Sequence, residues 1–336
     1  MRSAARFTGM TVVGRIGFVV LWLLSAASAV GAVAGYLGPF SRTMDLIGGS
    51  RLQFFFLSWL ILVPTIIGFV WRKSRCSLLV LTVIAGGAAI NSFEVLPWYF
   101  SQGGKGTASG SGPEVKLLAF NVLHQNTHFH EVRQYLNKEK PDLAVFFEAT
   151  GAWPRELLSL DQSMPHHLSF RKQQFEIFSR HPILEIRERL FGDHRGYVVI
   201  VLDVDGKRFT VCPNHAMPQF HYGESGFQLR NEQLEIGIGT EIAELESPVA
   251  VIGDLNVDIW SPLYRSMVKK SGLVDARRGF GVMPTHWGIG TLRHQHLLGR
   301  PIDHCLVTAD VEVLEMKTGP PLGSDHLAVV VRLKLP

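Results

Sequence analysis

The stretch Leu52–Trp71 constrains this chain most, because none of its residues carries a charged side chain. An apolar run of about 20 residues is what a helix needs to cross the hydrocarbon core of a bilayer. Two neighbouring stretches, Ile16–Leu37 and Ser77–Tyr99, are close to this length and are also strongly apolar. Residues 1–100 are therefore predicted to form a membrane anchor of three transmembrane helices, with Pro64 tolerated inside the second one.

The first apolar stretch also has features of a secretory signal peptide, since Arg2 and Arg6 precede an apolar core that small residues follow. Two further spans come directly after it, which favours a retained first helix. Glu94 is expected at the membrane interface, because Trp98 and Tyr99 form an aromatic belt close by. A functional carboxylate inside the membrane is the alternative.

Positive charges predict how the three spans are oriented. The more basic segments are the N-terminal one and the second loop, which hold Arg2, Arg6, Arg15, Arg72, Lys73 and Arg75. Segments rich in Lys and Arg stay in the cytoplasm. After three spans the rest of the chain is then expected on the other side, in the periplasm or outside the cell.

The Gly/Ser-rich stretch Ser101–Pro113 is typical of a flexible linker. We therefore expect an anchor at 1–100, a linker at 101–113 and a globular domain at 114–336, which is long enough to bury its own core. The net charge is +4, and part of the basic excess lies in the anchor, where membrane topology explains it. The charge is therefore weak evidence for a nucleic-acid partner.

The three cysteines, Cys76, Cys212 and Cys305, have neither the spacing of a metal site nor the number needed for a disulfide framework. Cys212 and Cys305 lie in apolar, strand-like runs, so buried free thiols are favoured. A single bridge between these two residues stays an alternative if the domain faces an oxidising compartment.

Residues 114–336 alternate strand and helix patterns. Strands are predicted at Val115–Asn121, Leu143–Phe147, Phe175–Ser179, Tyr197–Val204, Lys207–Cys212, Val249–Ile252, Ile302–Val307 and Leu327–Leu335. Asp205-Gly206 predicts a type I′ hairpin turn. Helices are predicted at Glu131–Lys140, Gln228–Glu244 and Leu263–Ser271. A mixed sheet in a layered α/β domain follows from this order.

Polar side chains suited to metal or phosphate chemistry stand at the ends of several predicted strands. They are Asn121, Glu148, His215, Asp254, Asn256, Asp303, Asp325 and His326. Each one alone is better explained by a turn or a surface position. Their recurrence at strand ends favours a site for metal-assisted phosphoryl transfer, because Mg²⁺ prefers carboxylate and amide oxygens and histidine supplies a proton or a charge. The histidines of HQNTHFH (His124, His128, His130) have no regular zinc geometry, so a polar loop is favoured there.

Residues 114–336 resemble the endonuclease/exonuclease/phosphatase superfamily. The resemblance rests on AFN, FFEAT, FSRHPI, NHA, a helix with Arg230 and Gln233, GDLN, PTHW, IDH and GSDH, in this order. GDLN followed by a C-terminal SDH is the specific part. With three spans ahead of it, the chain looks like a membrane-anchored bacterial member, which places it in the inner membrane as a multi-pass protein. The resemblance implies a four-layered α/β sandwich of two packed mixed sheets with outer helices.

The resemblance also implies a role for each site residue. Glu148 resembles the principal metal-binding carboxylate, with Asn121 and Asp325 beside the metal, which is Mg²⁺ or Mn²⁺. Asp254 resembles the group that orients or deprotonates the attacking water. Asn256 resembles the amide that holds a phosphate oxygen, and His326 the histidine that contacts the phosphate, with Asp303 orienting His326. His215 resembles a histidine that serves as phosphate ligand or proton donor.

The function implied is a divalent-metal-dependent phosphohydrolase, in particular a phosphodiesterase that cleaves a nucleic-acid, lipid or inositol-type phosphoester by in-line attack of water. FFEAT is shorter than the aromatic-rich signature of abasic-site endonucleases, and no basic, aromatic-interleaved track lies between Glu148 and His215. Both features speak against abasic-site repair. The alternative is an inactive, membrane-tethered binding or scaffold domain of the same fold.

Overall fold

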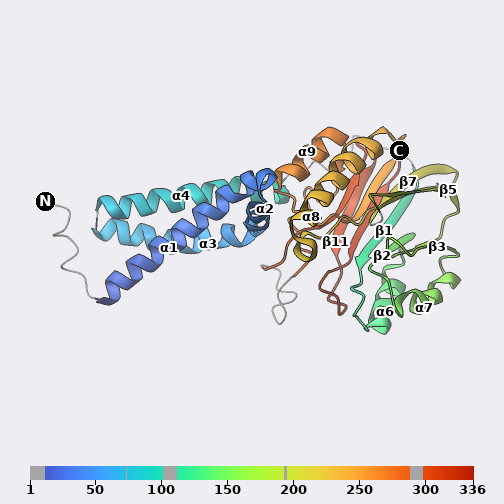
Figure 1. The fold of residues 1–336 in the computed structure, drawn as a ribbon, viewed down its shortest axis with the longest axis horizontal. Helices are drawn as coiled ribbons and strands as arrows, with labels where there is room; N and C mark the ends of the chain where they lie inside the picture. Colours follow the sequence, from blue (N-terminus) through green and yellow to red (C-terminus); the bar gives the residue numbers. More distant parts are fainter. Residues whose placement is uncertain (1–11, 73, 101–111, 193–194, 288–297) are drawn as a thin grey trace. The chain divides into compact units, whose positions relative to one another are not determined.

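The computed structural model describes residues 12–72, 74–100, 112–192, 195–287 and 298–336. They form two compact units, which divide between Leu96 and Pro97 (Figure 1). Most of the predicted linker, together with Arg2 and Arg6, lies outside the described residues.

The first unit is helical. It consists of α1 (Val12–Ala34), η2 (Gly35–Phe40), α2 (Arg42–Gly48), α3 (Arg51–Arg72) and α4 (Arg75–Val95). Three stretches, Ile16–Phe40, Arg51–Trp71 and Arg75–Phe100, are long and apolar enough to cross a membrane. Helix α3 continues through Pro64. Many large apolar side chains of the unit are exposed, as the lipid-facing side of such helices requires.

Buried polar side chains connect the three long helices of this unit. Ser28 Oγ of α1 lies 2.5 Å from Ser58 Oγ of α3, and Asn91 Nδ2 of α4 donates to the same Ser58 oxygen at 3.2 Å. Glu94 accepts a hydrogen bond from the Tyr36 hydroxyl at 2.5 Å. In lipid, hydrogen bonds between helices stabilise their packing by about 0.6 kcal/mol each.

The second unit contains two six-stranded mixed sheets. The first has the order β11 (Glu312–Thr318), β12 (Val329–Lys334), β1 (Glu114–Asn121), β2 (Leu143–Phe147), β4 (Phe175–Ser179) and β3 (His166–Phe170). The second has the order β5 (Ile183–Leu190), β6 (Gly196–Val204), β7 (Lys207–Pro213), β8 (Val249–Asp254), β10 (Asp303–Val307) and β9 (Val274–Asp275). Strands β1 and β2 are parallel, as are β7 and β8; the other strand pairs among the described residues are antiparallel.

Alternation along the strands builds two apolar layers. In β1, Leu117 and Ala119 belong to the core between the sheets, which also includes Ile252 of β8. Leu118 and Phe120 point to the opposite face and join a second cluster with α6 (Phe129–Glu139) and α7 (Trp153–Leu157). A strand buried on both faces must be apolar throughout, which explains the continuous runs of β1, β2 and β8.

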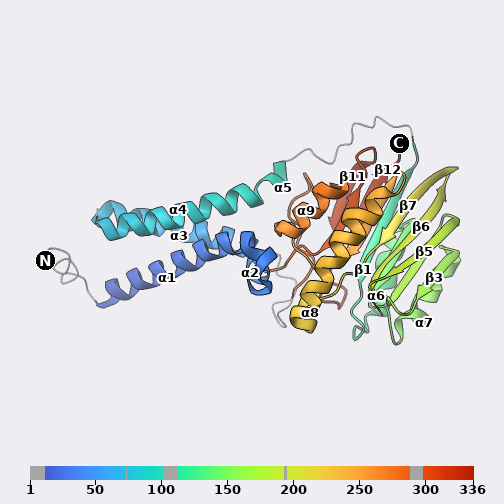
Figure 2. The same ribbon diagram turned by 45° about the horizontal axis from the view of Figure 1, so that its top comes forward.

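Helices cover both outer faces of the paired sheets (Figure 2). Alongside α6 and α7, the short η3 (Leu158–Gln162) lies on the face of the first sheet. The second sheet is covered by α8 (Gln219–Glu232), η4 (Gln233–Glu241), η5 (Ile242–Glu244) and α9 (Pro262–Ser271). The predicted four-layered α/β sandwich is confirmed. The short helix α5 (Pro97–Phe100) begins the second unit. The Trp98 carbonyl in this helix accepts the N–H groups of Gly279 and Gly281.

Most predicted elements are present, and the differences have local causes. The helical segment predicted at Gln228–Glu244 begins earlier, at Gln219. Its first turns were not predicted, because Gly223 and Gly226 interrupt the amphipathic pattern and Gly223 forms a kink with non-helical φ and ψ. Strands β3, β5, β9 and β11 were not predicted; β9 is only two residues long, and β5 is exposed along most of its length and so lacks an apolar pattern. Asp205 and Gly206 both have positive φ, as the predicted type I′ turn requires.

The bridge considered between Cys212 and Cys305 is not formed. Both cysteines are free and buried, one on β7 and one on β10. Strand β8 lies between them, since Cys212 pairs with Val251 and Cys305 with Ile252.

Candidate active site

Strand directions bring the predicted site residues to one edge of the two sheets. The parallel pairs β1/β2 and β7/β8 end next to Asn121, Glu148, His215 and Asp254. Strands β10 and β12 run antiparallel to β8 and β1, so they begin where those strands end. Asp303 consequently pairs in register with Asp254.

Gly253 lets β8 lie close to the end of β7 and to β2 of the first sheet. Its φ is +147°, and a Cβ atom there would lie 2.1 Å from the Asn214 carbonyl oxygen and 2.6 Å from the Phe147 ring. A side chain would therefore collide with the end of β7 and with β2. Glycine at this position places Asp254 between the two sheets.

Asp254 is at the centre of the candidate site. Its carboxylate is buried, with Oδ2 accepting from Asn121 Nδ2 at 3.2 Å and Oδ1 accepting from the Asn256 N–H at 3.0 Å. Burial raises the pKa of Asp254 to about 7, against the opposing charge of His326. A carboxyl group held in this way is preorganised to orient or accept a proton.

His326 forms a buried ion pair with Asp303. Its Nδ1 lies 2.8 Å from Asp303 Oδ2, and its Nε2 lies 3.7 Å from Asp254 Oδ2. Burial opposes the charge on the ring, but Asp303 and then Asp254 outweigh it and raise the pKa of His326 to about 10. The imidazolium is therefore held between two carboxylates, with Nε2 facing Asp254.

Glu148 follows β2 directly and has a φ of +54°. Its side chain is half-buried and faces cationic or imidazole groups. Arg195 Nη2 lies 3.4 Å from Oε1, His215 Nε2 lies 3.9 Å from the same oxygen, and His124 Nδ1 lies 3.8 Å from Oε2. The predicted polar loop at His124 thus contributes a residue to the site.

His215 is fully buried between the two sheets, with Phe147 and Phe175 in ring contact. Its Nε2 lies 2.6 Å from Arg195 Nη1 and 3.6 Å from Asp254 Oδ2. Burial, and next the charge of Arg195, hold the pKa of His215 well below its usual value. Because a guanidinium only donates, Nε2 accepts in this contact and the ring is neutral.

Asn256 and Asp325 lie at the margins of this arrangement. Asn256 has a φ of +50°, and its Nδ2 donates to the Ala216 carbonyl at 3.0 Å. Asp325 is partly exposed, accepts from Ser324 Oγ at 3.4 Å, and has His286 Nε2 at 3.7 Å from Oδ2. Arg195 and His286 contact site residues but were not predicted as site residues. His286 lies in PTHW, where the resemblance gave it no role, and Arg195 is a single polar residue in a loop.

Candidate metal ligands fall into two groups within the described part of the chain. Ligand atoms of His286, Asp325 and His326 lie within 4.8 Å of one another, and so do those of Asp254, Asp303 and His326. Glu148 belongs to neither group. The structure therefore connects the predicted residues through successive contacts, from Glu148 through His215 and Asp254 to His326. It does not gather Glu148 and Asp325 into one ligand cluster.

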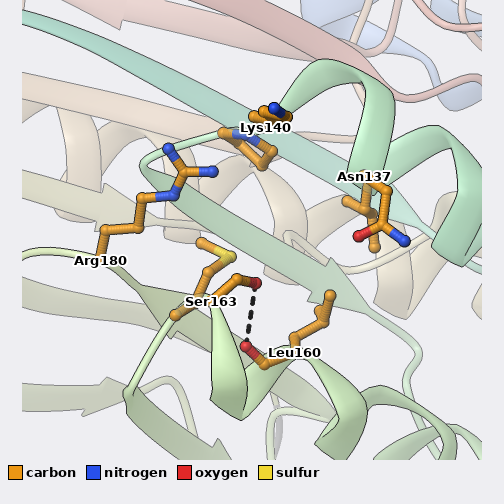
Figure 3. Close-up of a pocket in the computed structure, with 8 residues that line it drawn as sticks. Asn137, Lys140, Leu160, Ser163 and Arg180 are labelled. Atoms are coloured by element: carbon orange, nitrogen blue, oxygen red, sulfur yellow. Dashed lines mark hydrogen bonds between the residues drawn. The ribbon is translucent and has the colours of Figure 1, made fainter.

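A separate surface cavity of about 410 Å³ lies at the other end of β2 (Figure 3). Lys140 and Arg180 line it, together with Ser163, whose hydroxyl donates to the Leu160 carbonyl at 3.2 Å. Lys140 precedes β2 whereas Glu148 follows it, so the strand separates this cavity from the candidate site. A strand of this length spans about 17 Å.

Comparison with known proteins identifies the family. The model of the Endonuclease/Exonuclease/phosphatase family matches residues 118–326. No curated protein matches the chain.

Solved structures share the fold at low sequence identity. Sphingomyelinase C from Streptomyces griseocarneus has a TM-score of 0.50 and 19% identity over 67% of this chain and 100% of that one. An endonuclease/exonuclease/phosphatase from Beutenbergia cavernae has a TM-score of 0.52 and 20% identity over 66% and 72%. A D. rerio TDP2 humanized by 14 mutations has a TM-score of 0.53 and 16% identity over 66% and 99%. The family match covers more than half of the chain, and the chain belongs to the endonuclease/exonuclease/phosphatase family.

Proposed function

We propose that this protein is a membrane-anchored phosphodiesterase that depends on a divalent metal. Members of its family are metal-dependent phosphoester hydrolases, and this chain is a hydrolase of that type. The observation that supports the proposal most strongly is the position of Asp254. Its buried carboxylate accepts hydrogen bonds from Asn121 Nδ2 and from the Asn256 N–H. It lies 3.7 Å from Nε2 of His326, and Nδ1 of the same ring is paired with Asp303.

Each group in this arrangement has a proposed role. Asp254 orients and deprotonates the water that attacks phosphorus, because it is the buried carboxylate at the centre of the contacts. His326 Nε2 faces the Asp254 carboxylate and is proposed to stabilise charge on the phosphate oxygens, while Asp303 fixes the orientation of its ring. Asn256 is proposed to contact the phosphate from the second sheet. His215 is neutral and its Nε2 accepts from Arg195, so this atom has no proton to donate and no direct phosphate contact is proposed for it.

The donor set fits a hard divalent cation. Glu148 and Asp325 offer carboxylate oxygens and Asn121 an amide oxygen, the ligand type that Mg²⁺ and Mn²⁺ prefer. The side chains of Glu148 and Asp325 are 18% and 25% exposed, which leaves access for an ion with part of its water shell. When bound there, Mg²⁺ or Mn²⁺ would offset negative charge on the phosphate.

The proposed substrate is a phosphoester of nucleic-acid, lipid or inositol type. The apolar helices of the first unit are proposed to hold the protein in a bacterial inner membrane. From the distribution of Arg and Lys, the catalytic unit is proposed to lie on the periplasmic side.

Hydrolysis of bis-p-nitrophenyl phosphate by the purified full chain in detergent tests this function. We expect activity with Mg²⁺ or Mn²⁺, its loss with chelator, and a decrease of about 100-fold or more in Asp254→Asn. Asp205→Asn is the matched control, because Asn also suits the first position of a type I′ turn. Absence of hydrolysis with every divalent metal, on this ester and on a panel of DNA, RNA, sphingomyelin and inositol phosphates, would instead support an inactive binding domain.

A further inference from the structure

Arg195 contacts two residues of the candidate site, and the mechanism proposed above does not use it. It directly precedes β6, and its side chain is 14% exposed. Its Nη1 is 2.6 Å from His215 Nε2 and its Nη2 is 3.4 Å from Glu148 Oε1. The guanidinium therefore bridges two groups that come from different sheets.

The backbone around Arg195 is fixed by hydrogen bonds to Gln233 and to His215. Its carbonyl oxygen accepts Gln233 Nε2 at 2.7 Å, and Gln233 is itself buried and accepts the Met217 N–H at 2.8 Å. The next carbonyl, that of Gly196, accepts the His215 N–H at 3.2 Å. These bonds fix the backbone of Arg195 next to the loop that carries His215, and the contacts with His215 and Glu148 hold its guanidinium.

The contact with His215 determines where the positive charge lies. Arginine donates through all five N–H bonds and accepts none, so His215 Nε2 accepts from it and carries no proton. On this side of the site the cationic group is thus Arg195 and not His215. Among the described residues, the two contacts above are the hydrogen bonds of the guanidinium, which leaves further donors for a ligand.

Charge balance then points to an anion. Glu148 is the negative partner of Arg195, and Glu148 is also the proposed principal ligand of a divalent cation. With a cation on this carboxylate, the guanidinium is no longer needed to neutralise it. The planar fork of an arginine matches two oxygens of a phosphate group.

Building on the phosphodiesterase function proposed above, we propose that Arg195 is a substrate-binding residue that donates to the non-bridging oxygens of the phosphoryl group. It binds the phosphate from the side of the second sheet, to which β6 belongs. Negative charge on these oxygens grows as water attacks, so the contact strengthens during the reaction.

Inorganic phosphate binding, measured by calorimetry on the full chain in detergent with Mg²⁺, tests this role independently of turnover. We expect Arg195→Met to weaken phosphate binding about 10- to 100-fold, as loss of a charged hydrogen bond does, and Arg195→Lys to lie in between. Arg187→Met is the matched control, because Arg187 is exposed on β5 and its loss changes the charge equally. Thermal unfolding of each variant verifies the fold.

Turnover of bis-p-nitrophenyl phosphate gives the second measurement. For Arg195→Met we expect kcat/KM to fall by a similar factor while the Mg²⁺ concentration for half-maximal activity changes less than about twofold. Unchanged phosphate affinity in Arg195→Met would overturn the proposal, and a shift in Mg²⁺ requirement alone would assign Arg195 to neutralising Glu148. Failure of the wild type to bind phosphate would also overturn it. If the wild type binds phosphate but hydrolyses no ester, the proposed function fails while the phosphate affinities still decide the role of Arg195.

Discussion

His304 shows how one buried histidine makes stability depend on pH. The ring lies 1% exposed beside Tyr264 and donates from Nε2 to the Val257 carbonyl at 2.8 Å. Burial, and next the charge of Arg277, lower its pKa to about 3. The unfolded chain takes up a proton near pH 6.5 and the folded chain does not, so this group reduces stability as pH falls below 6.5.

Removing this histidine should therefore flatten the acid side of the stability profile. Between pH 6.5 and 4 its contribution falls by up to about 1.4 kcal/mol per pH unit. We expect His304→Gln to be less stable than the wild type at pH 7.5, because it disturbs a packed site, and to approach the wild type at pH 5. Thermal unfolding at both pH values measures this, and a difference that stays constant with pH would contradict it.

The residues of the candidate site differ in how visible they are in the sequence. Glu148 and Asp254 were predicted because each stands at the end of a strand with an unbroken apolar run, Glu148 just after β2 and Asp254 as the last residue of β8. Arg195 was not, because it stands alone in a loop and gains its meaning only from the fold, which brings His215 and Glu148 to it. Nor could sequence show that Asp325 lies next to His286, since that contact depends on pairing between distant loops.

At the level of elements, Gly253 sets the spacing between the end of β8 and the neighbouring strands. Its positive φ and the absence of a side chain both matter, since a Cβ atom would overlap the Asn214 carbonyl. Gly206 in the β6–β7 turn also has a positive φ, of +84°, but no heavy atom lies within 4 Å of the position that a Cβ would take. Comparing the two separates backbone strain from steric overlap.

Gly253→Ala should accordingly be much more harmful than Gly206→Ala. Backbone strain alone costs about 1–2 kcal/mol in the turn, whereas overlap with fixed backbone adds to it at Gly253. Denaturant unfolding of the two variants measures the difference. Equal loss of stability would show that β8 can move away from Asn214, and that the close approach is not required.

Elements were predictable where a strand is buried on both faces. The central strands β1, β2 and β8 carry their signal in local composition. Edge strand β5 has an exposed, charged pattern, and it forms because β6 offers an unpaired edge. The first turns of α8 also lack a regular local pattern and were not predicted, because Gly223 adopts a non-helical conformation within them.

For the whole molecule, the apolar helices and the catalytic fold together predict an enzyme retained at a membrane. The C-terminal unit is expected outside the cytoplasm. A C-terminal alkaline phosphatase fusion should then be active and a C-terminal green fluorescent protein fusion dark, because the first needs the periplasm and the second the cytoplasm to fold. The reverse pattern would show that the catalytic unit faces the cytoplasm.

The central claim is that residues from distant parts of the sequence form one cation-dependent phosphoester site. Anomalous diffraction from crystals of the full chain grown with Mn²⁺ tests it most directly. The account predicts a peak about 2.1 Å from a Glu148 carboxylate oxygen, on the side that faces Asp254 and His326. A site with no peak, or with the ion bound away from Glu148, would contradict it.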